Sequence, residues 1–139
     1  MKLSFVVPVE STAFAAATTS GGWQDAAVHL AALDFEGIEL AIRDPAAVDA
    51  GRLEAALNDA GLVVPAIATG QAYLRDRLSL SSVDDRIRRA AAARLASHVQ
   101  LAARLRSMVT IGLIRGRIDG KREATLARFV DGIKPVLDA

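Results

Sequence analysis

Residues 37–43, Gly-Ile-Glu-Leu-Ala-Ile-Arg, form the stretch of sequence that decides the fold class. Large aliphatic side chains alternate here with small or polar ones, namely Ile38, Leu40 and Ile42 with Glu39, Ala41 and Arg43. A period of two predicts a β-strand with one aliphatic face. A strand in an open sheet covered by helices on both sides would be apolar on both faces. The alternation therefore favours a barrel wall, with helices outside and a partly polar lumen inside.

Strand and helix patterns alternate along the whole chain. Strands are predicted at residues 3–9, 37–43, 62–69 and 109–114, and helices at residues 23–34, 52–60, 84–105 and 122–137. Regular alternation of this kind predicts right-handed βαβ crossovers and a parallel sheet. Pro65 weakens the prediction of the third strand, and Pro135 is expected to kink or fray the last helix. Residues 11–22, 70–80 and 115–121 are expected to form loops.

The patterns together predict an α/β fold of four strand–helix units, (βα)4, with parallel strands and helices on the outer face. Four units are half of the eight that close a (β/α)8, or TIM, barrel. Residues 1–139 are therefore expected to form a single half-barrel domain. The alternative is an open, flavodoxin-like domain that binds a small phosphorylated ligand.

The composition narrows the classes of protein. The formal net charge of +1 argues against nucleic acid as a partner, and the absence of cysteine excludes disulfides and thiol chemistry. Hydrophobic residues make up 52% of the chain but aromatic residues only 4%, which is typical of aliphatic helices packed on a buried parallel sheet. No apolar run approaches the roughly 18 residues of a membrane helix. We expect a cytoplasmic protein with no membrane contact.

The segments of the predicted strands and loops resemble a known family. Gly37-Ile38-Glu39-Leu40 looks like the second strand of the xylose isomerase-like TIM barrels, the sugar phosphate isomerase/epimerase superfamily. Residues 67–74, 78–80 and 111–116 are similar to one branch of that superfamily. The resemblance runs through the whole chain, but it matches only the N-terminal half of the family's barrel.

This resemblance implies isomerisation or epimerisation of a small sugar or sugar-like polyol. The family's usual cofactor is a divalent metal of the Mn, Mg or Zn type, held by Glu, Asp, His and Glu at the ends of later strands. The resemblance assigns no metal ligand and no cofactor to this chain. We expect a truncated isomerase/epimerase-like protein that is weakly active or inactive alone. The alternative is a non-catalytic scaffold that self-associates to complete a barrel.

Candidate site residues follow from position, because barrel sites form at the carboxyl ends of the strands. Glu39, on the lumen face, is the candidate catalytic base or substrate contact, unless it is a structural carboxylate paired with Arg43 or Arg115. Arg43 is a candidate substrate-binding residue by position, and Arg115 could hold a phosphate or carboxylate with both arms of its guanidinium, or be solvated. Gln71 and Tyr73 could bind sugar hydroxyls, or pack within their loop.

Several charged or polar side chains on the predicted helices are interpreted as structural. His29 and His98 are expected at the helix surface or between helix and sheet. The arginines of the long third helix are expected to form a solvated face, without the aromatic residues that nucleic-acid surfaces carry: Arg86, Arg88, Arg89 and Arg94. Arg77 follows Asp76 where glycine would be easier, and Arg106-Ser107 stands where the resembled family often has a glycine-containing turn between helix and strand. A left-handed backbone at either place would cost of order 1 kcal/mol.

A half barrel leaves two strand edges and a lumen face uncovered, and open edges favour pairing with another chain. Val6, Ala41, Ala66, Ala68 and Ile114 are the residues expected on that face. We therefore predict a homodimer, or another self-association through the open edges, in which two copies close an eight-stranded pseudo-barrel. A small sugar-like molecule is the other expected partner.

Overall fold

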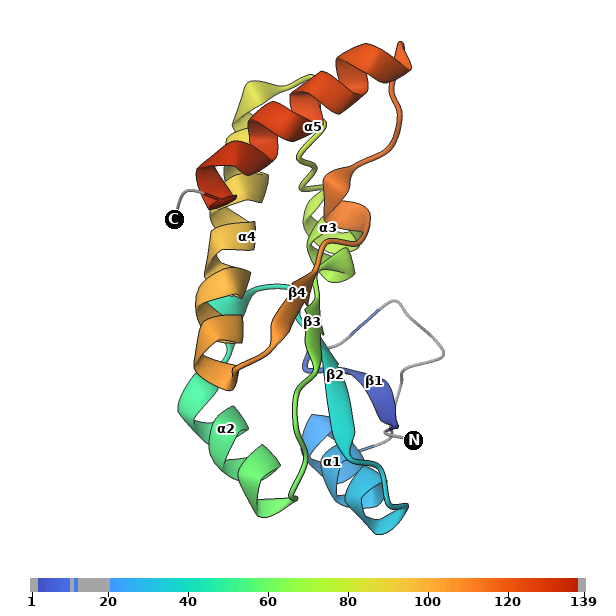
Figure 1. The fold of residues 1–139 in the computed structure, drawn as a ribbon, viewed down its shortest axis with the longest axis vertical. Helices are drawn as coiled ribbons and strands as arrows, with labels where there is room; N and C mark the ends of the chain where they lie inside the picture. The colour runs from blue at the N-terminus through green and yellow to red at the C-terminus, as the bar shows by residue number, and fades with distance from the viewer. Residues whose placement is uncertain (1–2, 11, 13–20, 138–139) are drawn as a thin grey trace.

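The computed structural model describes residues 3–10, 12 and 21–137, which form one parallel sheet flanked by helices. The strands are β1 (Ser4–Pro8), β2 (Gly37–Ala41), β3 (Ala66–Ala68) and β4 (Met108–Thr110). They pair in the order β1-β2-β3-β4 (Figure 1). A flavodoxin-like sheet reverses its strand order partway. The sequential order therefore contradicts that alternative and confirms the (βα)4 arrangement.

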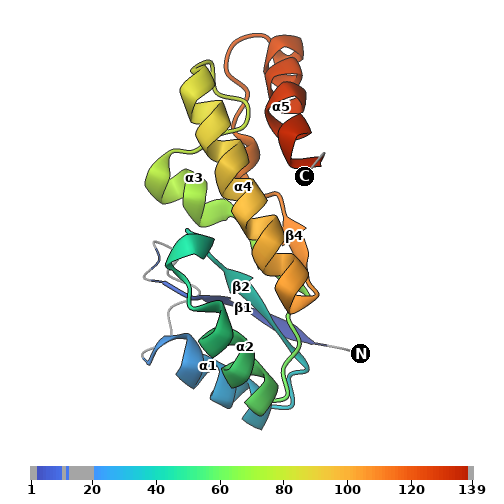
Figure 2. The ribbon, with the colours of Figure 1, turned by 90° about the vertical axis from the view of Figure 1, so that its left-hand side faces the viewer.

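The four predicted helices are present, and the structure adds one short helix and two 3₁₀ turns. The helices are α1 (Gly22–Ala32), α2 (Ala50–Asp59), α3 (Gly70–Asp76), α4 (Asp85–Leu105) and α5 (Arg122–Leu137), with short 3₁₀ turns η2 (Pro45–Ala47) and η3 (Leu113–Arg115). Helices α1, α2 and α4 lie on one side of the sheet (Figure 2). One hydrophobic cluster fills the space between these helices and the strands, a second joins α3, α4, η3 and α5, and Val109 packs against both.

The two faces of the sheet differ in burial, as the alternation predicted. Val7, Leu40 and Ile67 lie side by side on the helix-covered face and are completely buried. On the opposite face, Val6 is 41% exposed and Met108 is 71% exposed. Helices therefore cover one face only, and the other face borders the space that a closed barrel would enclose.

Pro65 lies in an irregularity of the pairing between β2 and the segment before β3. Gly37 bridges to Val63 and Leu40 pairs with Ile67, so the partner segment has one residue more than β2 over this stretch. A bulge of this kind accommodates a residue without an N–H group, because the ladder is interrupted there. The third strand is therefore shorter than the predicted 62–69.

The fourth strand ends earlier than predicted, which changes the surroundings of Ile114. The backbone N–H of Gly112 donates to the carbonyl of Thr110 at 3.0 Å, and the chain turns into η3 instead of continuing as a strand to residue 114. Ile114 is completely buried in the second cluster. The prediction that Ile114 lies on the open lumen face is wrong.

One of the three predicted loops contains a helix. Residues 70–76 form α3 instead of a loop; this helix has about two turns, too few to show a helical period in the sequence. Most of the loop predicted at residues 11–22 lies outside the described residues. Helix α5 continues through Pro135 to Leu137.

Arg77 and Arg106 end α3 and α4 in the left-handed conformation, with φ of 57° and 54°. This confirms the expectation from the sequence that these positions ask for a conformation that glycine adopts more easily. Each arginine carries a strain of about 1 kcal/mol. Among the described helices, none is both long and apolar enough to span a membrane.

Candidate functional site

A hollow of about 190 Å³ lies at the carboxyl ends of the strands, and we call it the carboxyl-end hollow. It is bordered by the ends of β1, β2 and β3 and by the start of α3, through Val6, Pro8, Thr12, Ala41, Ala68, Thr69, Gly70, Gln71, Gly112 and Leu113. Active sites of TIM barrels lie at this end of the strands. The volume is below the roughly 300–1,000 Å³ of complete ligand pockets. The hollow by itself can therefore enclose only part of a ligand.

Gln71 supplies the most prominent polar group of the carboxyl-end hollow. Its side chain is nearly buried, and its Nε2 donates to the hydroxyl of Thr12. The amide oxygen of Gln71 is buried without a hydrogen-bond partner. Whichever way the amide is turned, one of its two polar atoms remains unpaired, and leaving such an atom buried costs about 1–3 kcal/mol. The surface of the hollow is almost entirely apolar, so a ligand hydroxyl could pair with this buried atom only if the Gln71 side chain turned towards the hollow.

Thr69 and Glu10 are two further polar residues at this end of the sheet. The hydroxyl of Thr69 donates to the carbonyl of Thr110 at 2.9 Å and accepts from the N–H of Gly112 at 3.3 Å, so its hydrogen bonds fix the wall of the hollow. Glu10 follows β1, and its Oε2 is buried without a hydrogen-bond partner. Oε2 of Glu10 is therefore a second buried acceptor without a hydrogen-bond partner at the strand ends, although the charge of Glu10 contributes to the raised pKa of Arg43.

Glu39 lies on the lumen face of β2, as predicted, but not at the rim of the site. It pairs in register with Val6, whereas Ala41, two residues further along the strand, lines the carboxyl-end hollow. Its side chain is half-buried and makes no hydrogen bond or ion pair with any described residue. Glu39 therefore lies level with Val6, at the deep end of the hollow, and does not itself line it.

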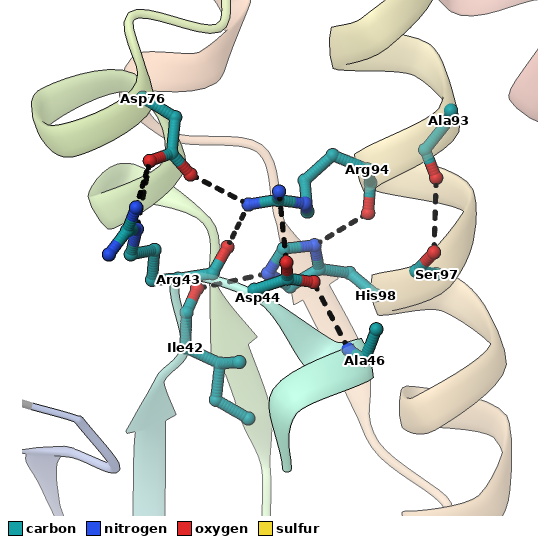
Figure 3. A network of polar contacts seen from close by, with 9 residues as sticks. All are labelled: Ile42, Arg43, Asp44, Ala46, Asp76, Ala93, Arg94, Ser97 and His98. Atoms are coloured by element: carbon teal, nitrogen blue, oxygen red, sulfur yellow. Dashed lines mark hydrogen bonds and ion pairs between the residues drawn. The ribbon is translucent and has the colours of Figure 1, made fainter.

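Arg43 belongs to an ion-pair network that ties three elements together (Figure 3). Its Nε donates to Oδ1 of Asp76, at the end of α3, at 2.8 Å. Arg94 of α4 donates to Oδ2 of Asp76 at 2.9 Å and lies 3.1 Å from Oδ2 of Asp44. The interpretation of Glu39 as a partner of Arg43 is wrong, because Arg43 pairs with Asp76.

The charges of this network are mutually stabilising. The hydrogen bond from Arg43 holds the pKa of the Asp76 carboxyl below its usual value, and a second hydrogen bond from Arg94 acts in the same direction. The hydrogen bond to Asp76, followed by its negative charge, raises the pKa of Arg43. Burial of Asp76 opposes these effects but does not outweigh them. The network therefore fixes the position of α3, and with it Gln71, above the sheet.

His98 anchors the same network to the sheet from the buried face of α4. Its Nε2 lies 3.0 Å from the carbonyl oxygen of Ile42, just after β2, and its Nδ1 lies 2.8 Å from the carbonyl oxygen of Arg94. The side chain is completely buried. The structure thus confirms that His98 packs between helix and sheet.

Tyr73 and Arg115 do not join Gln71 at the carboxyl-end hollow. Tyr73 lines a different hollow, where the guanidinium of Arg117 lies 6.0 Å from the centre of its ring. Arg115 is exposed at the end of η3, where no described side chain pairs with it. Of the predicted substrate-binding residues, only Gln71 lines the carboxyl-end hollow, and Arg43 lies nearby in the ion-pair network.

Among known proteins, the similarity found is to a solved structure and not to a family or a curated sequence. No family model matches the chain, and no curated protein matches it. A crystal structure of D-psicose 3-epimerase in the presence of D-fructose is similar, with a TM-score of 0.63 and 21% sequence identity. The chain folds as half of a TIM barrel. The alignment covers 86% of this chain and 43% of the epimerase chain, so this chain spans less than half of that structure.

The sequence resemblance implies a divalent metal, which needs several ligating side chains close together. Within residues 3–10, 12 and 21–137 no group of three or more His, Cys, Asp or Glu side chains is placed to hold a metal ion. Of the acidic side chains near the strand ends, Asp76 and Asp44 bind arginines, and Glu10 and Glu39 belong to no group of three possible ligands among the described residues. The described residues therefore do not fit such a cofactor.

Sequence reasoning missed three residues that shape the site, namely Thr12, Asp76 and Arg94. Arg94 was assigned to a solvated face, yet its side chain is only 19% exposed. A signal was present, because Arg94 lies three residues after Ala91 and four before His98, both of which are buried. That spacing puts all three on one helix face. Nothing comparable in the sequence identified Asp76 or Thr12.

Proposed function

We propose that this chain is a sugar isomerase/epimerase-like half barrel that contributes part of a binding site for a small polyol. The observation that carries the proposal is the carboxyl-end hollow, with the unpaired buried amide atom of Gln71. Its position matches the end of the barrel at which catalytic sites form. The likeness to an epimerase solved in the presence of D-fructose supports the same ligand class.

The residues of the chain suit binding better than complete catalysis. Gln71 can exchange hydrogen bonds with a sugar hydroxyl, and Thr69 and Ala68 shape the wall beside it. Isomerisation and epimerisation require a base that removes a proton next to a carbonyl and returns it. Glu39 and Glu10 are the carboxylates available for such a transfer. Neither lies among the residues that line the carboxyl-end hollow, so we expect weak activity, or none, from the half barrel alone.

Replacing Gln71 with alanine is expected to weaken the binding of D-fructose about tenfold, because the substitution removes both hydrogen-bonding atoms of the amide. Saturation-transfer NMR with titrated D-fructose measures the effect. Gln100→Ala is the matched control, since Gln100 is exposed on α4 away from the hollow. Circular dichroism establishes that both variants are folded. Equal affinity of Gln71→Ala and Gln100→Ala would contradict the proposed site.

A second function, assembly, is favoured by apolar side chains at both open edges of the sheet. Large exposed hydrophobic residues gather at the β1 edge and in and after β4, namely Leu3, Phe5 and Val6, and Met108, Ile111 and Leu113. Unpaired edges with apolar side chains favour pairing with another strand. We propose that the strand which pairs with each open edge belongs to a second copy of this chain.

Geometry supports a second copy as the partner. A two-fold axis parallel to the strands would place β4 of one copy beside β1 of the other, in the parallel direction that the rest of the sheet uses. The four strands of each copy would then give the eight of a closed TIM barrel. The carboxyl-end hollows of both copies would face one lumen, which would enlarge the space for a ligand.

Sedimentation equilibrium at micromolar concentration is expected to give a dimer. Met108→Lys, at the β4 edge, should raise the dissociation constant at least tenfold, since a charge would be buried in the lumen that the two copies enclose. Val63→Lys is the control, because Val63 is also exposed but precedes β3 in the middle of the sheet. A clean monomer for the unmodified chain would contradict assembly, as would dissociation equally strong in the control. Binding of a different half barrel in place of a second copy would also contradict it.

A further inference from the structure

A second concavity, of about 300 Å³, lies between the segment after α3 and the segment after η3. We call it the arginine–serine pocket, and its polar lining comprises Tyr73, Arg77, Ser79, Ser81, Ser82, Arg117 and Asp119. Two guanidinium groups and three serine side chains thus border one small space, and the hydroxyl of Ser81 already donates to the carbonyl of Arg117. None of these residues lines the carboxyl-end hollow.

The two arginines of this pocket have no acidic partner among the described residues, unlike the arginines that hold the helices to the rest of the fold. Arg43, Arg94 and Arg104 each form an ion pair with a carboxylate. Neither Arg77 nor Arg117 forms an ion pair with any described residue, although Arg117 lies over the ring of Tyr73. Both guanidinium groups are therefore available to an anion.

The walls of the pocket are held together by contacts from α5. Nε of Arg128 donates to the carbonyl of Ser81 at 2.9 Å, and a second nitrogen of the same guanidinium donates to the carbonyl of Asp119 at 3.1 Å. Arg128 therefore ties the two segments that form the pocket. The hydroxyl of Thr125 also donates to the carbonyl of Asp119, at 2.8 Å, and this threonine is buried.

Gly116 brings the two segments close together where they meet. Its φ of 92° with ψ of −177° lies in a region that is essentially restricted to glycine. A Cβ at this position would overlap the hydroxyl oxygens of Ser79 and Ser81. The backbone at Gly116 therefore packs directly against the side chains of Ser79 and Ser81. This close packing fixes the position of one wall of the pocket relative to the other.

We propose that the arginine–serine pocket binds the phosphate group of a small phosphorylated ligand. Arginine side chains hold phosphate oxygens through paired, charge-assisted hydrogen bonds, and serine hydroxyls add further donors. Two cations and two hydroxyls suit a tetrahedral dianion better than a carboxylate, which has only two oxygens to bind. The carboxylate of Asp119 also lines the pocket. Its negative charge repels an anion and so lowers the affinity of the pocket for phosphate. The proposal does not depend on the polyol site, since the two hollows share no residue.

The proposal is tested with substitutions that remove either a positive or a negative charge from the pocket and should therefore change phosphate affinity in opposite directions. Inorganic phosphate and glycerol 3-phosphate are titrated at constant ionic strength, and binding is followed by NMR chemical-shift changes of backbone amides. Arg77→Gln and Arg117→Gln should each weaken binding about tenfold, as expected for loss of one charge-assisted contact. Asp119→Asn should strengthen binding severalfold. Arg75→Gln is the matched control, because Arg75 is exposed on α3 and does not line the pocket.

The two probes also identify the source of the phosphate group. Tighter binding of glycerol 3-phosphate than of inorganic phosphate supports a phosphorylated substrate or effector, and equal binding supports recognition of the phosphate group alone. The proposal is overturned if neither probe binds at millimolar concentration. It is also overturned if Arg75→Gln weakens binding as much as Arg77→Gln, or if Asp119→Asn has no effect, since either result would indicate a general surface charge effect.

Discussion

Replacing Leu40 with alanine is expected to lower the free energy of unfolding by about 2–5 kcal/mol. Leu40 is completely buried on the helix-covered face of β2, in register between Val7 and Ile67. Truncation removes apolar contacts and leaves a cavity that the neighbouring strands and helices can fill only in part. Urea unfolding followed by circular dichroism measures the loss.

Glu39→Ala is the matched control for this prediction. Glu39 precedes Leu40 on the same strand but lies on the lumen face, and it has no hydrogen-bond or ion-pair partner among the described residues. We expect its substitution to change the free energy of unfolding by about 0.5 kcal/mol or less. Comparable losses for Leu40→Ala and Glu39→Ala would show that both faces of β2 are packed, which would contradict the half barrel.

Replacing His98 with alanine is expected to cost about 3 kcal/mol, from lost packing and from a backbone carbonyl left without its partner. The imidazole fills a completely buried position and connects α4 to the carbonyl of Ile42 at the end of β2. The ion pairs of Arg94 lie one helical turn away, so the substitution should also loosen α3. Thermal unfolding and amide hydrogen exchange of residues 70–76 measure the two effects.

The chain offers an unusually close control for His98. His29 on α1 makes the same local contact, with Nδ1 2.8 Å from the carbonyl oxygen of Asp25 four residues earlier, but it is exposed and has no tertiary contact of this kind. His29→Ala should therefore change stability by only about 0.5 kcal/mol. A similar loss in both variants would mean that the local helix contact, and not the link to Ile42, stabilises the protein.

The strand pattern was predictable because successive side chains of a strand point to opposite faces of the sheet, so their polarity shows which face is buried. The alternation around Leu40 predicted one buried and one open face, and both are present. The prediction failed where the backbone left the regular period: Gly112 begins a turn after Thr110, and Ile114 is consequently buried in the second cluster. A period of two holds only while the ladder continues.

The candidate site was predicted less completely, and α3 shows why. Gln71 and Tyr73 were grouped as neighbours in one loop. On a helix with 3.6 residues per turn, positions two apart differ by about 200°. Gln71 therefore lines the carboxyl-end hollow, while Tyr73 lines the arginine–serine pocket. Because so short a helix leaves no periodic signal, sequence alone could not separate the two residues.

The sequence by itself determined the order of strands and helices, the parallel sheet and the face of β2 that is buried, because these features depend on the period of neighbouring side chains. Only the tertiary structure decided the partners of Asp76. This carboxylate binds Arg43, 33 residues earlier, and Arg94, 18 residues later. The carboxyl ends of the strands and the adjoining helices meet only after the chain has folded, so no local pattern specifies contacts between them.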